Sequence, residues 1–171
     1  MNQIKWKIHS YGSDYRKSVK SAFTIIERAF NLFDNWVISY SGGKDSTAML
    51  HMITSVNKSV KVMTQVDDCD WPEKRPYIDK IQELFGCEIN FVEPDFSIWE
   101  AALKHNLGFD DICSKSHNLT KYGFIEPLEA KRRELNCDGV FMGLRKEESK
   151  ARETNYATHS HTYRVKSGEY Y

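Results

Sequence analysis

Apolar residues along the chain follow two spacings, and each change of spacing marks a new element. Between residues 14 and 33 they recur with helical periodicity, which predicts an amphipathic helix carrying Val19, Ala22, Phe23, Ile26, Phe30 and Phe33 on one face. Short runs rich in β-branched and aromatic residues predict strands at about 36–40, 59–66, 88–92 and 139–143. An alternating stretch with Ile4, Trp6 and Ile8 predicts a further short edge strand.

Helical spacing returns between the predicted strands. We expect helices after residue 44, at about 75–85 with Gly86 at the C-terminus, at 96–105 and at 127–135. Residues 106–124 are polar and lack clear periodicity, which predicts a long loop or lid, and the tail from 159 to 171 predicts a hairpin.

This alternation of strands and helices predicts an α/β fold, a doubly wound and mainly parallel sheet with helices on both faces. We expect one Rossmann-like domain over residues 1–171, with a core at about 36–152, a strand and helix in 1–35 and a tail in 153–171. In such sheets a ligand sits at the carboxyl ends of the strands, where the connections change direction.

A glycine turn joins the first predicted core strand to the following helix, at Ser41, Gly42 and Gly43. Glycine lets a ligand approach the backbone closely, and the unpaired N–H groups of the first helical turn favour an anion such as phosphate. Lys44 adds a positive charge, Ser41 and Ser46 add hydroxyls, and Asp45 lies in the first turn. The spacing excludes a Walker A loop, which needs glycine at position 38 and serine or threonine at position 45.

The sequence Ser-Gly-Gly-Lys-Asp-Ser at 41–46 resembles the PP-loop of the adenine-nucleotide α-hydrolase-like superfamily. Within it, the chain is most similar to the phosphoadenosine phosphosulfate (PAPS) reductase family. That family has a Gly-x-Arg-x-x-Glu/Gln-Ser-x-x-Arg motif, which Gly143, Arg145, Glu148, Ser149 and Arg152 match. Two further segments are similar to the family more loosely. Residues 67–69 and 71–74 keep the family's leading Asp and its Pro-Glu pair, and residues 125–130 are similar to another family segment.

The resemblance and the residue types together indicate a nucleotide site. Phosphate or sulfate would bind to residues 41–46, Gly143 and Ser149, with Arg145 and Arg152 as guanidinium clamps. Lys44, Arg145 and Arg152 are the expected catalytic residues. For Asp67 two interpretations stay open, a ribose or Mg²⁺-phosphate contact and a helix cap. The backbone of Ser39 and Tyr40 would contact adenine, although core packing explains Tyr40 equally well.

Charge and cysteine content narrow the classes of function. The chain carries 24 basic and 24 acidic residues, so direct nucleic-acid binding is disfavoured. Cys69, Cys87, Cys113 and Cys137 form no Cys-x-x-Cys pair, so we expect no iron–sulfur cluster and no zinc ribbon. His159 and His161 are expected to be exposed polar residues, so we assign no metal site. Without a membrane-spanning run or signal peptide, a reducing cytoplasm is the expected location.

The expected function is binding of an adenine nucleotide, ATP or PAPS, with chemistry at its phosphate or phosphosulfate group. With ATP, the bond between the α- and β-phosphates would be cleaved, and Mg²⁺ is an optional ion. With PAPS, a thiol would attack the sulfonate, and a thioredoxin-like protein would serve as the reductant. The family's C-terminal Glu-Cys-Gly motif has no counterpart here, so the nucleophile of sulfonucleotide reduction is missing unless Cys69, Cys113 or Cys137 is recruited. We expect the chain to be either a naturally short form or a fragment.

Two alternatives stay open at this stage. One is a non-catalytic nucleotide-binding module that regulates a protein partner. The other is a subunit of a nucleic-acid thiolation or phosphorothioation system. A homo-oligomer is compatible with each of these functions.

Overall fold

A computed structural model describes residues 10–104, 106, 121–144, 150, 153, 154 and 157. The strand expected at 4–8, most of the loop expected at 106–124 and the hairpin expected in the tail lie outside these residues. The chain divides into two compact units, Met1–Asp34 and Asn35–Tyr171, which are described separately.

Most of the described part of the first unit is the long helix α2 (Ser13–Leu32). Asp14 lies in its first turn, where a carboxylate favours the positive end of the helix dipole. Ile26 and Ala29 are its buried residues. The helical periodicity between 14 and 33 therefore predicted this element correctly.

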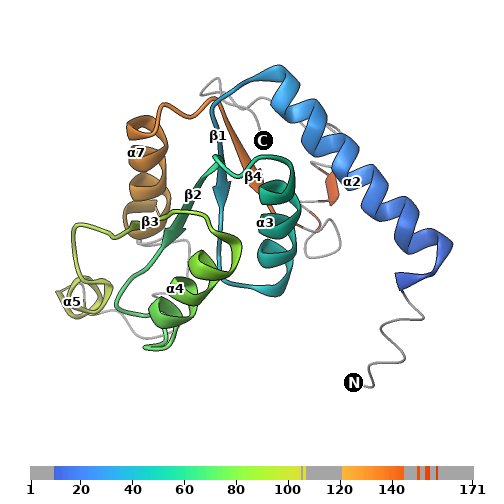
Figure 1. The fold of residues 1–171 in the computed structure, drawn as a ribbon. Coiled ribbons are helices and arrows are strands. Elements are labelled where there is room, and N and C mark those ends of the chain that lie inside the picture. Colours follow the sequence, from blue (N-terminus) through green and yellow to red (C-terminus); the bar gives the residue numbers. More distant parts are fainter. Residues whose placement is uncertain are drawn as a thin grey trace. The chain divides into compact units, whose positions relative to one another are not determined.

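A four-stranded parallel sheet forms the centre of the second unit (Figure 1). Its strands are β1 (Trp36–Ser39), β2 (Lys61–Gln65), β3 (Ile89–Val92) and β4 (Gly139–Met142), in the order β3-β2-β1-β4. β1 pairs with both neighbours, so that Val37 lies opposite Lys61 on one side and Val140 on the other. The predicted α/β fold with a parallel sheet is confirmed.

Helices connect these strands and cover the two faces of the sheet. Helix α3 (Lys44–Val56) connects β1 to β2, and α4 (Lys74–Phe85) connects β2 to β3. Both connections move across the sheet in the same direction, so right-handed crossovers place the two helices on the same face. The return from β3 to β4 carries α7 (Glu126–Glu134) on the other face. There Leu128 and Leu135 pack against a cluster from all four strands, Val37, Met63, Val92 and Val140.

One described segment differs from its expectation. Residues expected to belong to a loop form a π-helix, η2 (Lys121–Ile125). The Gln65 side-chain amide, at the end of β2, donates a hydrogen bond to the Gly123 carbonyl. A Cβ atom on Gly123 would lie 3.6 Å from the side chains of Phe96 and Ile98, near the start of α5 (Ile98–Lys104). Distant contacts therefore order this segment, and local periodicity does not reveal them.

Among the described residues, no helix has the length and apolar character that crossing a bilayer requires.

Candidate functional site

Three segments of the predicted site meet at the carboxyl edge of the sheet. Ser41 follows β1, Asp67 follows β2 and Gly143 follows β4. Strand β1 sends its connection towards β2, whereas β4 returns to the opposite side of β1. The junction of β1 and β4 is therefore the switch point at which open α/β sheets bind ligands.

The 41–46 loop has the backbone geometry that an anion site requires. Gly42 adopts φ of +79°, a left-handed conformation that strongly favours glycine. Gly43 is the N-cap of α3 with extended backbone, and no side chain in the described part of the chain caps this helix end. The first N–H groups of α3 therefore point outward at the positive end of the helix dipole.

Two serine hydroxyls line this loop. The Ser41 and Ser46 hydroxyl oxygens lie 3.1 Å apart, and Ser46 also donates to the Gly43 carbonyl at 2.9 Å. Ser46 is buried, whereas Ser41 is exposed. The structure thus brings together the two hydroxyls that the sequence assigned to anion binding.

Lys44 lies at the mouth of the loop. Its side chain is 76% exposed, and its ammonium group forms a 3.1 Å ion pair with the Asp45 carboxylate. Pairs of this exposure contribute little free energy, about 0.2–1 kcal/mol. An incoming anion can therefore recruit Lys44 at low cost.

Gly143 contacts the same helix end from β4. A Cβ atom at this position would lie 3.3 Å from the backbone N and Cα of Ser46. The sequence motif that begins at Gly143 thus starts directly against the 41–46 loop. Its other members, Arg145, Glu148, Ser149 and Arg152, lie outside the described residues.

Tyr40 and Ser39 connect β1 to the loop. Tyr40 is only 2% exposed, its N–H donates to the Met63 carbonyl at 2.8 Å, and its hydroxyl lies 3.0 Å from the Thr47 hydroxyl. Burial raises the pKa of Tyr40 to about 12, with Thr47 partly opposing the rise and Tyr77 adding to it. The side chain of Tyr40 is therefore a neutral core group beneath the loop, while Ser39 is partly exposed at the strand end.

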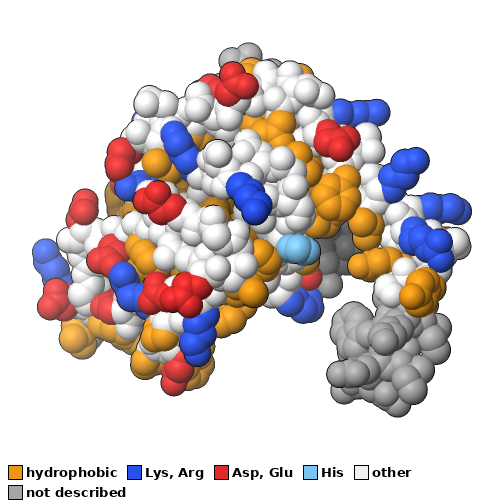
Figure 2. Space-filling model, in the orientation of Figure 1, with side chains coloured by type: hydrophobic (Ala, Val, Ile, Leu, Met, Phe, Trp, Pro, Cys, Tyr) orange, Lys and Arg blue, Asp and Glu red, His pale blue; other side chains and the backbone are white. Residues whose placement is uncertain are grey.

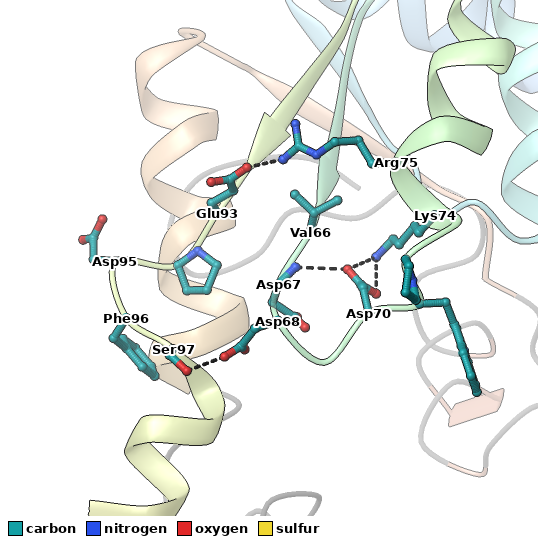
Figure 3. A pocket seen from close by; sticks show the side chains of 13 residues that line it. Val66, Asp67, Asp68, Asp70, Lys74, Arg75, Glu93, Asp95, Phe96 and Ser97 are labelled. Atoms are coloured by element: carbon teal, nitrogen blue, oxygen red, sulfur yellow. Dashed lines mark hydrogen bonds and ion pairs between the residues drawn. The ribbon is translucent and has the colours of Figure 1, made fainter.

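An acidic loop follows β2. The Asp67 carboxylate accepts a hydrogen bond from the Cys69 N–H at 2.9 Å, and the Asp67 N–H donates to the Asp70 carboxylate at 3.0 Å. Asp70 is paired with Lys74 at 2.7 Å (Figure 3). Asp67 thus shapes its own turn and does not cap α4, whose N-cap is Glu73.

Asp68, which the sequence analysis did not single out, is the residue that caps a helix. Its carboxylate accepts hydrogen bonds from the Ser97 hydroxyl and from the Ile98 N–H, the latter at 3.1 Å. Burial opposes ionisation, but these bonds and one from the Trp99 N–H outweigh it and lower the pKa of Asp68 below its ordinary value. The sequence around Asp68 does not predict this role, because its hydrogen-bond partners lie some thirty residues further along the chain.

A cavity of about 590 Å³ opens beside this acidic loop. Figure 3 shows Asp67, Asp68 and Asp70 on one side and the 93–97 segment on the other, with Arg75 paired to Glu93 above them. The ligand atoms that Asp67, Asp68 and Cys69 offer a metal lie within 4.8 Å of one another. Carboxylate oxygens suit Mg²⁺, but Asp68 is already committed to α5, so Asp67 is the carboxylate available to an ion.

The cysteines lie at different edges of the sheet. Cys69 is exposed and follows β2 at the carboxyl edge. Cys87 and Cys137 precede β3 and β4 at the amino edge, and burial raises the pKa of both thiols. Neither has the position or the thiolate character that attack on a nucleotide at the 41–46 loop requires. Cys113 lies outside the described residues.

Comparison with known proteins places these features in a family. A model of the phosphoadenosine phosphosulfate reductase domain matches residues 35–165. A phosphoadenosine 5'-phosphosulfate reductase from Alteromonas mediterranea is 32% identical over 126 residues, which are 71% of this chain and 49% of that protein. An adenosine 5'-phosphosulfate reductase from Bacillus cereus is 26% identical over 92% of this chain and 67% of its own length. The chain thus spans about half the length of the first curated relatives that it matches.

Solved structures show the same fold at lower sequence identity. A PAPS reductase from Candida auris, in a phosphate complex, aligns with a TM-score of 0.65 and 20% identity over 87% of this chain and 69% of its own. An NH3-dependent NAD synthetase from Campylobacter jejuni aligns with a TM-score of 0.59 and 14% identity, over 80% of this chain and 59% of its own. With the family model covering most of the chain, the resemblance seen in the sequence is confirmed: this chain belongs to the phosphoadenosine phosphosulfate reductase domain family.

Proposed function

We propose that this chain binds an adenylyl sulfonucleotide, PAPS or adenosine 5'-phosphosulfate (APS), at the junction of β1 and β4. The observation that carries the proposal is the uncapped N-terminus of α3, with the Ser41 and Ser46 hydroxyls beside it and Gly143 against it. Oriented N–H groups, hydroxyls and a mobile ammonium together suit a phosphate or sulfate group. Relatives named as PAPS and APS reductases support the sulfonucleotide class.

Each residue has a defined task in this proposal. The N–H groups of residues 44–46 hold the anion, and Lys44 turns from Asp45 towards it. Arg145 and Arg152 clamp the opposite side and Ser149 adds a hydroxyl, as their match to the family motif implies. Asp67 contacts a ribose hydroxyl from the end of β2.

The proposed reaction is reduction of the sulfonate by a dithiol. One thiolate attacks the sulfur, the sulfur–oxygen bond to the phosphate breaks, and its electron pair leaves with the nucleotide. The second thiol loses its proton and attacks the thiol-derived sulfur of the resulting S-sulfonate. The bond between that sulfur and the sulfonate sulfur breaks, sulfite leaves with the electron pair, and a disulfide remains. The dithiol loses two electrons and the sulfur gains them. A thioredoxin-like protein supplies at least one thiol, and this chain stabilises the leaving phosphate oxygen through Lys44, Arg145 and Arg152.

The other functions that the sequence left open have less support. On the face that Figure 2 shows, Lys and Arg side chains are mixed with Asp and Glu over the second unit, and further Lys and Arg side chains lie along α2. The formal net charge of zero disfavours direct nucleic-acid binding. For metal-assisted ATP cleavage, the described residues offer the Asp67 carboxylate after β2 and the Asp45 carboxylate in the loop, of which Asp45 is paired with Lys44.

Calorimetric titration of the purified chain with PAPS, APS, adenosine 3',5'-bisphosphate and ATP plus Mg²⁺ tests the proposal. We expect a sulfonucleotide and its nucleotide product to bind more tightly than ATP. Adding a dithiol such as reduced thioredoxin then tests for sulfite release. Tighter binding of ATP with release of pyrophosphate would overturn the proposal.

Replacing Lys44 with alanine tests the contribution of the loop. We expect the Lys44→Ala variant to lose roughly 1.5–3 kcal/mol of binding free energy for adenosine 3',5'-bisphosphate, because charge-assisted hydrogen bonds have this magnitude. Lys58→Ala is the matched control, since Lys58 is exposed beyond the opposite end of α3. Equal affinity of the two variants would remove Lys44 from the site.

A further inference from the structure

We propose that the outer edge of β3 binds an extended, basic segment of a partner protein, which adds a strand to the sheet beside α7. Strand β3 is one of the two outermost strands of the sheet (Figure 1). In the part of the chain that the structure describes, it pairs with β2 alone. The inference goes beyond the proposed function, because β2 separates this edge from the junction of β1 and β4.

The backbone of β3 faces β2 and the outside alternately. In a parallel pair, every second residue directs both its N–H and its C=O group to the same neighbouring strand. The Val92 carbonyl accepts a hydrogen bond from the Val66 N–H at 3.0 Å, so Val92 and Asn90 face β2. Ile89 and Phe91 therefore direct their backbone groups outward.

One of these outward groups is already bonded within the chain. The Ile89 N–H donates to the side-chain carbonyl of Gln82 at 2.6 Å, which closes the start of the edge. None of the described residues bonds to the N–H or the C=O of Phe91. A peptide that adds a strand to a sheet edge bonds to groups of this kind.

A groove of about 960 Å³ gives such a strand room for its side chains. Phe91 and Val92 line one side of the groove, and α7 lines the other. The lining positions on α7 include Glu126, Ala130 and Arg133, which lie on one face of the helix because they are four and three residues apart. Alternate side chains of an added strand would enter this groove, since successive side chains of a strand point to opposite faces.

Charge indicates which kind of strand fits. The groove is lined by two basic side chains on α7 and by five carboxylates, those of Glu93, Asp95, Glu126, Glu129 and Glu134. Residues 62–100, which contain β3, carry ten acidic and three basic side chains. This excess attracts lysine and arginine on the added strand, and it disfavours a second copy of the same acidic edge.

Three synthetic peptides serve as probes. The first is acetylated and amidated Lys-Val-Lys-Val-Lys-Val, a basic sequence with strand periodicity. The second has the same side chains with every backbone nitrogen methylated, so that it keeps the charge and loses its backbone donors. The third replaces each lysine with glutamate. Each is added to the full chain at low ionic strength, where exposed charges are least screened.

Residue-resolved amide hydrogen exchange reports on the edge directly. In the free protein, the Phe91 N–H should exchange faster than those of Asn90 and Val92, which are bonded to β2. Saturation with the lysine peptide should slow exchange at Phe91 by about two- to tenfold, the range for one added hydrogen bond. The methylated peptide and the glutamate peptide should leave the Phe91 rate unchanged.

Two charge variants of the full chain test the groove. We expect Glu129→Lys to bind the lysine peptide about two- to fivefold more weakly, the range for loss of an exposed ion pair. Glu83→Lys is the matched control, because it changes the net charge equally at an exposed position of α4 that does not line the groove. Equal affinity of the two variants would overturn the role of the groove.

Each remaining outcome also decides the inference. Failure of the lysine peptide to bind, or slow exchange of Phe91 in the free protein at every concentration, would overturn it. Protection of Phe91 that rises with protein concentration would show that a second copy is the occupant. Equal binding of the methylated peptide would exclude strand addition, and equal binding of the glutamate peptide would exclude a basic partner. These measurements need no nucleotide, so their failure leaves the proposed function intact.

Discussion

Gly143 is the residue at which the two sequence motifs of the site touch. The backbone N and Cα of Ser46 would lie 3.3 Å from a Cβ atom there, closer than the optimal separation of about 3.5–4.0 Å between carbon atoms. The contacted atoms belong to the first turn of a helix, so they cannot rotate away as a side chain would. A single methyl group at this position must therefore move β4 or α3.

We expect Gly143→Ala to cost about 1–3 kcal/mol of unfolding free energy, as overpacking does, and to weaken binding of adenosine 3',5'-bisphosphate. Gly123→Ala is the control, because its new methyl group would meet side chains at an ordinary 3.6 Å. Urea denaturation of both variants compares the costs. A Gly143→Ala protein as stable as Gly123→Ala would show that the two motifs are not in close contact.

At the scale of elements, α5 is a helix that depends on another part of the chain. Its seven residues are too few to form a stable helix alone. Asp68 supplies the cap from the end of β2, and its backbone carbonyl accepts a hydrogen bond from the Trp99 indole at 3.0 Å. The loop that carries Asp67 and the helix α5 are therefore held together by one residue.

The lowered pKa of Asp68 gives this cap a pH dependence. The ionised carboxylate stabilises the fold above its unfolded-state value of 3.8, and the stabilisation is lost as the pH falls through the lower folded-state value. We expect Asp68→Asn to unfold at a lower temperature than the unmodified protein at pH 7, with a difference that shrinks as the pH falls below 3.8.

Thermal unfolding at a series of pH values measures this difference. Asp95→Asn is the control, since Asp95 is an exposed carboxylate just before α5. A difference between Asp68→Asn and the unmodified protein that stayed constant down to the lowest pH would contradict an electrostatic cap.

The elements also show how far the sequence could predict the structure. The four strands and the helices between them follow from local periodicity, and the 41–46 loop follows from its glycines and its place between strand and helix. The π-helix η2 and the capping role of Asp68 do not, because each depends on a hydrogen bond to a residue far away in sequence.

At the scale of the whole molecule, stability comes from the apolar layers on the two faces of the sheet. Leu50 on α3 is fully buried, whereas Leu84 on α4 is 72% exposed. We expect Leu50→Ala to lower the free energy of unfolding by about 2–5 kcal/mol, because it leaves a cavity in the core. Leu84→Ala should change it by about 0.5 kcal/mol or less. Chemical denaturation of the two helix variants measures both, and equal losses would mean that α3 is not part of the core.

The pairing of β1 with β4 also sets the order in which the molecule is completed. β1, β2 and β3 follow one another along the chain and can pair as synthesis proceeds. Val37 on β1 can pair with Val140 on β4 only after the whole segment between them has been synthesised. Closing such a long segment is slow, because its entropic cost precedes any gain from contact. We therefore expect a nascent chain to hold three paired strands while its anion site is still open on one side. The capacity to hold a ligand would be the last property that this domain acquires as it folds.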